Sequence, residues 1–181
     1  MTTLFLVRHG RPLVDPHRQA NEWILDPQGI PAIERLRDSG HLPRQARWFS
    51  SPEPKAYATA RLLTDQPVEV VDDLAEHRRE STEWIEDFAT VVESAFARPS
   101  VSAWPGWEPL ADCRARVTAA VRNILATVEN PDDHVGDLVL VGHGTAWTVL
   151  ISELTRQPPD LDRWRAMAMP DLMTISLDEL S

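Results

Sequence analysis

The sequence predicts an α/β fold, a three-layer α/β/α sandwich around a mainly parallel central sheet. Two short apolar runs, Leu4–Val7 and Leu138–Val141, have the length and composition of strands buried on both faces. Other short β-branched runs alternate with stretches of helical periodicity, and such alternation is typical of a parallel sheet covered by helices.

A histidine followed by a glycine stands just after each of the two apolar runs. These pairs are His9-Gly10 and His143-Gly144, and Arg8 directly precedes the first. Parallel strands present their carboxyl ends at one edge of the sheet, where ligands of open α/β sheets bind. We therefore expect the two imidazoles to meet there and, with the arginine, to form a site for an anionic group.

The elements of the first half follow from turn and capping residues. Residues 11–28 are polar and rich in proline, and they predict a loop over the sheet edge. Pro31 fits the first turn of a helix through Ser39, which Gly40 closes. We next expect a strand at 47–50 and a helix from the N-cap pair Ser51-Pro52 to about Asp65. A strand at 68–71 should follow, and residues 72–76 lead away from its end.

The second half reads as more helical. Two sets of apolar residues have helical spacing: Ile85, Phe88, Val92 and Ala95, and then Val117, Val121, Ile124, Leu125 and Val128. The residues between them, 98–109, hold Trp104-Pro105-Gly106-Trp107 and predict a loop. After His143 we expect a helix containing Trp147, Leu150, Ile151 and Leu154, and then a final strand at Met173–Leu177.

Length and composition narrow the class of protein. A chain of 181 residues is one ordinary domain, and we predict a single domain over 1–181 with a helical and loop insertion at about 78–112. The formal charge of −10 argues against nucleic acid or an anionic membrane as partner. Cys113 is the only cysteine, which fits a reducing compartment. With no cationic leader before the first apolar run, we expect a cytoplasmic protein.

The residues at the expected edge suit transfer of a phosphoryl group to the protein. That reaction needs a nucleophile, positive donors for the equatorial oxygens and an acid for the leaving oxygen. His9 can be the nucleophile and Arg8 an anion clamp, while His143 can stabilise the developing charge. Gly10 and Gly144 allow the backbone to approach the ligand closely.

Four motifs in this order resemble the histidine phosphatase superfamily, the phosphoglycerate-mutase-like family. The motifs are Arg8-His9-Gly10, Ser50-Ser51-Pro52 with Lys55-Ala56 and Thr59-Ala60, Leu74-Ala75-Glu76, and Gly142-His143-Gly144-Thr145. The resemblance implies a phosphohistidine at His9, bound by Arg8 and His143, with Glu76 as proton donor and later base. We expect a phosphomonoesterase for a small substrate, with no cofactor and no metal.

The chain departs from the family pattern at three positions. Lys55, the only lysine among 18 lysines and arginines, stands where the family usually has its second phosphate-binding arginine. We expect it to contact the ligand from the first turn of its helix, less rigidly than an arginine fork would. Asp15 and His77 stand where the mutases of the family typically have asparagine and arginine. These two replacements argue against mutase activity and favour hydrolysis.

Several residues have two interpretations. Arg11, which we include among the substrate-binding candidates, Arg78 and Arg79 are either anion contacts or solvated charges. Trp104 and Trp107 either form a lid or anchor the core. The remaining histidines lack the spacing of a metal site, and we expect them at the surface: His17, His41, His77 and His134.

Two functions from different classes remain open. The first is a cofactor-independent phosphatase acting through His9. The second is a degenerate member of the same fold that binds a phosphorylated ligand or a protein without turnover, with Lys55 as the symptom. The sequence does not indicate an oligomeric state.

Overall fold

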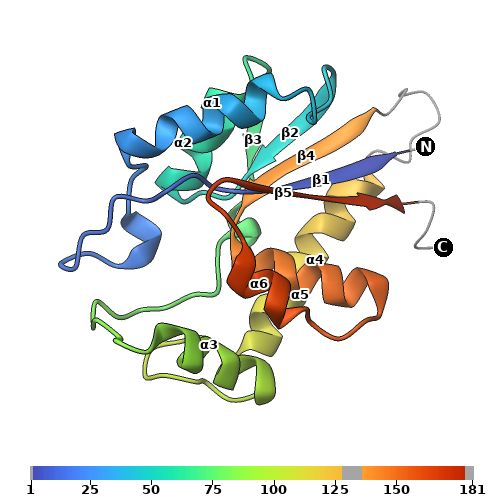
Figure 1. Ribbon diagram of the computed structural model, residues 1–181. Coiled ribbons are helices and arrows are strands. Elements are labelled where there is room, and N and C mark those ends of the chain that lie inside the picture. The colour runs from blue at the N-terminus through green and yellow to red at the C-terminus, as the bar shows by residue number, and fades with distance from the viewer. Residues whose placement is uncertain (1, 128–135, 178–181) are drawn as a thin grey trace.

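A five-stranded sheet forms the centre of the computed structural model, which describes residues 2–127 and 136–177 (Figure 1). The strand order is β3-β2-β4-β1-β5. The strands are β1 (Thr3–Arg8), β2 (Ala46–Ser50), β3 (Val68–Val70), β4 (Asp137–Gly142) and β5 (Asp171–Ser176). All neighbouring pairs are parallel except β5, which runs antiparallel to β1. The predicted mainly parallel sheet is confirmed.

Helices cover both faces of this sheet, so the predicted three-layer sandwich is confirmed as well. In Figure 1, α1 (Ile30–Asp38) and α2 (Pro54–Leu63) lie on one face, and α4 (Leu110–Ala126) and α5 (Gly144–Thr155) lie on the other. The short α6 (Leu161–Ala166) packs beside α5. Helix α3 (Phe88–Ala97) lies far from α1 and α2 in this view.

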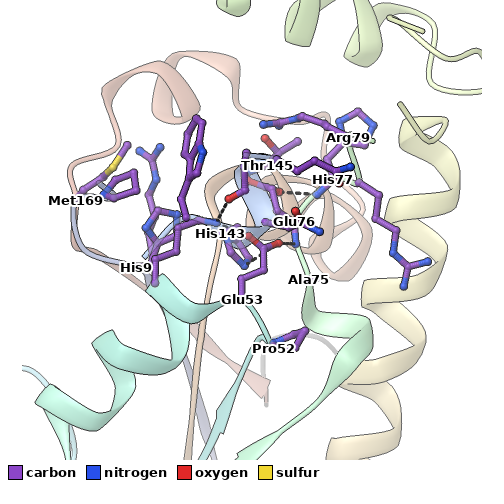
Figure 2. A pocket seen from close by; sticks show the side chains of 18 of the residues that line it. His9, Pro52, Glu53, Ala75, Glu76, His77, Arg79, His143, Thr145 and Met169 are labelled. Carbon is purple, nitrogen blue, oxygen red and sulfur yellow. Dashed lines mark hydrogen bonds and ion pairs between the residues drawn. The ribbon is translucent and has the colours of Figure 1, made fainter. Parts of the chain in front are cut away.

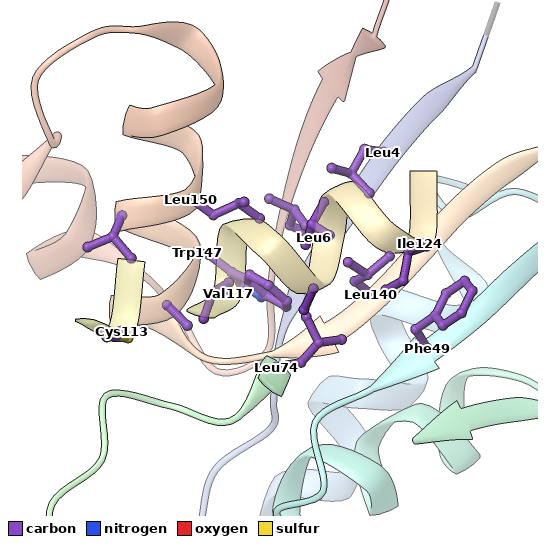
Figure 3. Close-up of a cluster of buried hydrophobic side chains, with 14 of the residues drawn as sticks. Leu4, Leu6, Phe49, Leu74, Cys113, Val117, Ile124, Leu140, Trp147 and Leu150 are labelled. Carbon is purple, nitrogen blue, oxygen red and sulfur yellow. The ribbon is translucent and has the colours of Figure 1, made fainter. Parts of the chain in front are cut away.

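Alternation along the two central strands divides the apolar residues between two cores. Leu4 and Leu6 of β1 belong to the cluster beneath α4 and α5 (Figure 3), whereas Val7 belongs to the cluster beneath α1 and α2. Leu140 and Val141 of β4 divide in the same way. Successive side chains of a strand point to opposite faces, so each of these runs supplies both cores at once.

Trp147 ties helix α5 to the sheet. Its side chain is fully buried, and its indole nitrogen donates a hydrogen bond to the carbonyl of Val7 over 2.9 Å. A Cβ at Gly142 would lie 2.5 Å from the indole ring. Gly142 is therefore the residue that lets the end of β4 approach this tryptophan.

The start predicted for the second helix is wrong. Helix α2 begins at Pro54, with Glu53 in the N-cap position. The Ser51 hydroxyl instead accepts a hydrogen bond from the Glu53 backbone N–H at 3.2 Å and contacts His143. The chain bends at residues 52 and 53 before the helix begins, and the serine stays against His143 at the sheet edge.

The helix predicted around residue 85 also begins later, at Phe88. The Asp87 side chain accepts a hydrogen bond from the Thr90 N–H and caps the helix there, so Ile85 lies in the loop before it. Helix α3 and its flanking loops occupy much of the stretch 78–112, whose status as an insertion stays a prediction. Val128 lies outside the described residues.

Candidate active site

The two histidine-glycine pairs meet at the carboxyl edge of the sheet, as expected. Strands β1 and β4 are adjacent and parallel, and Arg8 is in register with Gly142. The His9 backbone N–H donates to the Gly142 carbonyl over 2.9 Å. The ring centroids of His9 and His143 are 5.1 Å apart, with the rings inclined at 66°. The strand pairing alone therefore brings together residues separated by most of the chain.

A cavity of ≈ 920 Å³ opens over this pair of imidazoles (Figure 2). Five of its lining residues were expected at the site, and another four extend the wall. The expected residues are Arg8, His9, Glu76 and His143, joined by Lys55, and the wall continues through Glu53, Arg79, Trp23 and Trp164. In Figure 2, His9, His143 and Glu76 lie next to one another in that order. Gly10, Arg11 and Gly144 do not line the cavity.

His9 is held in one tautomer by its own neighbour. Its Nδ1 lies 2.6 Å from the carbonyl oxygen of Gly10, and because a carbonyl only accepts, Nδ1 carries the proton. Nε2 therefore keeps its lone pair. Burial lowers the pKa of His9 well below its usual value, and the neighbouring His143 and Lys55 lower it further. The ring is neutral and its Nε2 has the lone pair that a nucleophile needs.

The two glycines make close packing possible around these rings. The Gly10 N–H donates to the Thr59 hydroxyl at 2.9 Å, and a Cβ at Gly10 would lie 2.5 Å from the Ile33 side chain. A Cβ at Gly144 would lie 3.2 Å from Nε of Arg8. Both glycines serve packing in this structure, and their contact with a ligand stays a prediction.

Arg8 is anchored at one end of its guanidinium. Its Nη1 donates to the carbonyl of Met167 over 2.8 Å. Its Nε is buried and has no hydrogen-bond partner among residues 2–127 and 136–177. Burial lowers the pKa of Arg8, while Glu76 and Asp171 oppose this shift. The fixed guanidinium thus retains an unused donor beside the cavity.

His143 is oriented by Ser51. The Nε2 of His143 lies 2.7 Å from the Ser51 hydroxyl oxygen, which already accepts a hydrogen bond from Glu53 N–H. A hydroxyl proton directed at Nε2 leaves the imidazole proton on Nδ1, which is buried and lacks a partner among the described residues. Burial lowers the pKa of His143 although Glu53 and Glu76 raise it.

Glu76 is a carboxylate held at the start of helix α5. Its oxygens accept hydrogen bonds from the backbone N–H groups of His77 at 2.9 Å, Thr145 at 3.1 Å and Ala146 at 2.8 Å. Burial raises its pKa, but His143, Arg79 and these N–H groups outweigh burial and lower the pKa to about 2. Without a ligand Glu76 is therefore ionised.

Lys55 faces the cavity from the first turn of α2, where it is paired with Glu53. Its Nζ donates to the Glu53 carboxylate and to the Ala20 carbonyl, the latter over 2.6 Å. Both side chains of the pair are 6% exposed. The second Glu53 oxygen accepts the Glu76 N–H at 2.9 Å and lies 3.5 Å from Nε2 of His143. Burial raises the pKa of Glu53, but His143 and Lys55 lower it overall.

The three further arginines have different environments. Arg11 pairs with Asp26 at 3.0 Å, and its side chain is 63% exposed. Arg78 lines the cavity but is exposed and lies 3.8 Å from Asp73. The guanidinium carbon of Arg79 lies 4.7 Å from the ring centroid of Phe88 and 4.7 Å from that of Trp107. The solvated-charge interpretation therefore describes Arg11 in this structure, and it does not describe Arg79.

The expectation that His77 lies at the surface is wrong. Its side chain is 2% exposed, its Nε2 lies 2.7 Å from the Glu108 carbonyl, and its ring packs against Trp107. Trp107 is therefore a core anchor, and Trp104 donates to Glu83 outside the cavity. His17 and His41 are exposed, and His134 lies outside the described residues.

A comparison with protein-family models decides the family. The model of the histidine phosphatase superfamily, branch 1, matches residues 4–179. The chain belongs to this superfamily. The family assigned from the four motifs is thus confirmed, and comparison with curated proteins gave no match.

Solved structures share the superfamily fold at low sequence identity. Mycobacterial glucosyl-3-phosphoglycerate phosphatase is 20% identical, with a TM-score of 0.75 over 96% of this chain and 89% of the other. YhfR of Bacillus stearothermophilus is 21% identical, with a TM-score of 0.73 over 97% and 91%. Phosphoglycerate mutase of Bacillus anthracis is 18% identical, with a TM-score of 0.73 over 96% and 87%. These likenesses establish the fold.

Within 2–127 and 136–177, no group of three or more His, Cys, Asp or Glu side chains is arranged to hold a metal ion. In the same part of the chain, no helix has the length and apolar character needed to cross a bilayer.

Sequence reasoning missed the residues that organise this histidine phosphatase site. Arg116 donates to the carbonyls of Asp73, Ala75 and Glu76 and pairs with Glu108 at 2.5 Å, so it fixes the loop that carries Glu76. Glu53 was also missed. Its signal was an acidic residue two positions before the only lysine of the chain.

Proposed function

We propose that the protein is a phosphomonoesterase that hydrolyses a small phosphorylated substrate through a phosphohistidine at His9. The observation that carries this proposal is the hydrogen bond between Nδ1 of His9 and the Gly10 carbonyl, which leaves Nε2 with its lone pair. A neutral imidazole in a cavity wall that also holds Arg8 and His143 suits attack on phosphorus. Membership of the superfamily and the phosphatases among the structures of the same fold support this activity.

In the first step, Nε2 of His9 forms a bond to phosphorus while the bond to the ester oxygen breaks. Arg8, Lys55 and the Nδ1–H of His143 supply positive charge or donors for the phosphoryl oxygens. Glu76 passes a proton to the departing ester oxygen. In the second step, water attacks phosphorus, Glu76 takes a proton from it, the N–P bond breaks, and inorganic phosphate leaves.

The proton for the first step arrives with the substrate. Glu76 has a pKa of about 2 without a ligand and is therefore ionised at neutral pH. The second pKa of a phosphomonoester is about 6, so a monoanionic substrate carries a proton. The negative phosphoryl group raises the pKa of the carboxylate beside it, which lets Glu76 take this proton and deliver it to the ester oxygen.

A non-catalytic, ligand-binding member of the fold is the second candidate. The observation that favours it is the engagement of the Lys55 ammonium by Glu53 and by the Ala20 carbonyl. A phosphate must compete with these acceptors. The first candidate remains the better supported, because the histidine pair and Glu76 are in place.

Hydrolysis of p-nitrophenyl phosphate across a range of pH separates the two candidates. We expect turnover by the wild type, loss of turnover in His9→Ala, and retained turnover in His41→Ala, which removes an exposed histidine outside the cavity. Rapid quenching at alkaline pH and intact-mass measurement should detect one added phosphoryl group in the wild type. Failure of the wild type to turn over at any pH contradicts the proposal.

A further inference from the structure

Arg116 of helix α4 holds the chain that carries Glu76, although it does not itself line the cavity. Its Nη1 donates to the carbonyls of Asp73 at 2.9 Å and Ala75 at 3.0 Å. Its Nη2 donates to the carbonyl of Glu76 at 3.2 Å. One guanidinium therefore binds three carbonyls of a short segment that ends at the proposed proton donor.

Glu108 fixes the Arg116 guanidinium in turn. Its carboxylate lies 2.5 Å from Nη2 of Arg116, and the two side chains are 15% and 10% exposed. The same carboxylate oxygen accepts the Arg78 backbone N–H at 2.8 Å, and the Glu108 N–H donates to the Arg78 carbonyl over 3.0 Å. A planar fork that meets a carboxylate and carbonyls together has little freedom to move. The pair thus ties α4 to the backbone on both sides of Glu76.

The residues that follow Glu76 lie along the segment before α4. Nε2 of His77 lies 2.7 Å from the Glu108 carbonyl, and the Glu80 N–H donates to the Gly106 carbonyl over 2.8 Å. Residues 77–80 therefore run beside residues 106–108. The loop with Glu76 is held by Arg116 on its N-terminal side and by this pairing on its C-terminal side.

The Glu76 carboxylate lies at the start of α5, which packs against α4. Its oxygens accept the backbone N–H groups of Thr145 and Ala146. A proton donor works only within about 2.6–3.2 Å of the atom that it protonates. A displacement of about 1 Å can cost about 100-fold in rate. The Glu76 backbone must therefore be held closely, and Arg116 makes the largest set of side-chain contacts to it.

We propose that Arg116 is a positioning residue, which holds Glu76 where it protonates the departing ester oxygen. This inference rests on the proposed function. Arg116 acts through Glu76, whereas Arg8, His9 and His143 are held by other contacts, with Met167, Gly10 and Ser51. Loss of Arg116 should therefore weaken proton delivery and leave the groups around phosphorus in place. Its effect should depend on how much the leaving group needs a proton.

Two aryl phosphates isolate proton delivery. p-Nitrophenyl phosphate and phenyl phosphate differ by one nitro group. p-Nitrophenolate is a stable anion that leaves with little help, whereas phenolate is more basic and gains more from a proton donor. General acid catalysis contributes about 10²–10⁴-fold. In Arg116→Met we expect kcat/KM for phenyl phosphate to fall about 10- to 100-fold, with little change for p-nitrophenyl phosphate. Equal falls for the two probes overturn the inference, because general damage to the fold would affect both.

Three further variants assign the effect. Arg116→Lys keeps a cation that can reach fewer of the carbonyls, so it should restore part of the phenyl phosphate activity. Glu108→Gln weakens the hold on Arg116 and should shift the ratio of the two kcat/KM values in the same direction. Arg114→Met is the matched control, because Arg114 lies on the same helix, is 47% exposed and lies 3.7 Å from Glu153. A ratio altered as much in Arg114→Met as in Arg116→Met contradicts the assignment.

The outcomes separate this inference from the proposed function. If the wild type hydrolyses neither probe, the phosphatase proposal fails and the inference fails with it. If the wild type hydrolyses both and Arg116→Met keeps the wild-type ratio, the inference alone fails. Glu76→Gln should alter the ratio at least as much as Arg116→Met, and an unaltered ratio there removes the proton donor through which Arg116 acts. If Arg116→Met does not fold, unaltered ratios in Arg116→Lys and Glu108→Gln overturn the inference.

Discussion

The buried ion pair between Lys55 and Glu53 should show strong energetic coupling. Lys55→Met removes the ammonium and leaves the Glu53 carboxylate in a 6% exposed position with one backbone donor, the Glu76 N–H. Breaking a buried pair from one side costs about 3–5 kcal/mol. We expect the free energy of unfolding to fall by about that amount in Lys55→Met.

Removing the charge on the other side should cost less. Glu53→Gln leaves the Lys55 ammonium with the Ala20 carbonyl as an acceptor, and an amide oxygen can replace one carboxylate oxygen. We expect a loss of about 1–3 kcal/mol. In the double variant the second substitution removes a group that the first had already left unpaired. The double variant should therefore be more stable than the sum of the two losses predicts, by about 1–3 kcal/mol.

Urea denaturation of the four proteins measures this coupling directly. Arg37 and Asp38 offer a matched control, because they form a 2.8 Å pair with side chains 44% and 66% exposed, and we expect no resolvable coupling between them. Additive losses at Lys55 and Glu53 would refute the buried-pair reasoning.

Activity should not follow stability in this cycle. The double variant regains part of the stability but still lacks the Lys55 cation, so kcat/KM for p-nitrophenyl phosphate should stay about 100-fold below the wild type, as expected for loss of one transition-state donor. If the double variant regained wild-type kcat/KM, Lys55 would be a structural residue only.

Four shorter predictions concern neighbouring groups. Log kcat/KM should fall as pH rises through about 6, because the proton-carrying monoanion disappears, and a flat profile to pH 8 would contradict delivery of the proton by the substrate. Because the pKa of buried His9 is lowered, the unfolded chain binds more protons below pH 6.5, so the free energy of unfolding should decrease as pH falls from about 6.5, by up to about 1.4 kcal/mol per pH unit for this group. Gly142→Ala places a Cβ 2.5 Å from the Trp147 ring and should cost about 1–3 kcal/mol in urea denaturation, whereas unchanged stability would show that the indole can move. Ser51→Ala removes the partner of Nε2 of His143 and should lower kcat more than it raises KM, and a change confined to KM would argue against control of the tautomer.

Local sequence patterns predicted the sheet and the meeting of the two histidines. Leu4–Val7 and Leu138–Val141 are short apolar runs with adjacent polar residues, and parallel pairing of two such strands brings their following residues to one edge. The placement of His9 and His143 needed no other information. The ion pairs and hydrogen bonds around the two histidines could not be predicted in this way, because they join segments whose relative positions depend on the packing of the whole domain.

Burial of His77 shows where local reasoning fails. Its ring is enclosed by Trp107 and by the carbonyl of Glu108, which are about thirty residues further along the chain. The prolines and tryptophans at 98–109 predicted a loop, but a loop prediction does not say what the loop covers. The antiparallel bridge between Arg79 and Trp107 was missed for the same reason.

The lysine at position 55 is best understood together with Glu53. As a substitution of arginine alone it suggests a weakened phosphate clamp, because a point charge replaces a bidentate fork. In the structure this point charge lies between the Glu53 carboxylate and the Ala20 carbonyl, while Glu53 also holds the backbone N–H of Glu76. A compact ammonium satisfies both acceptors from the first turn of α2. Lys55 is therefore one half of an ion pair that connects the proposed phosphate binding to the placement of Glu76, so the role proposed for Lys55 depends on Glu53.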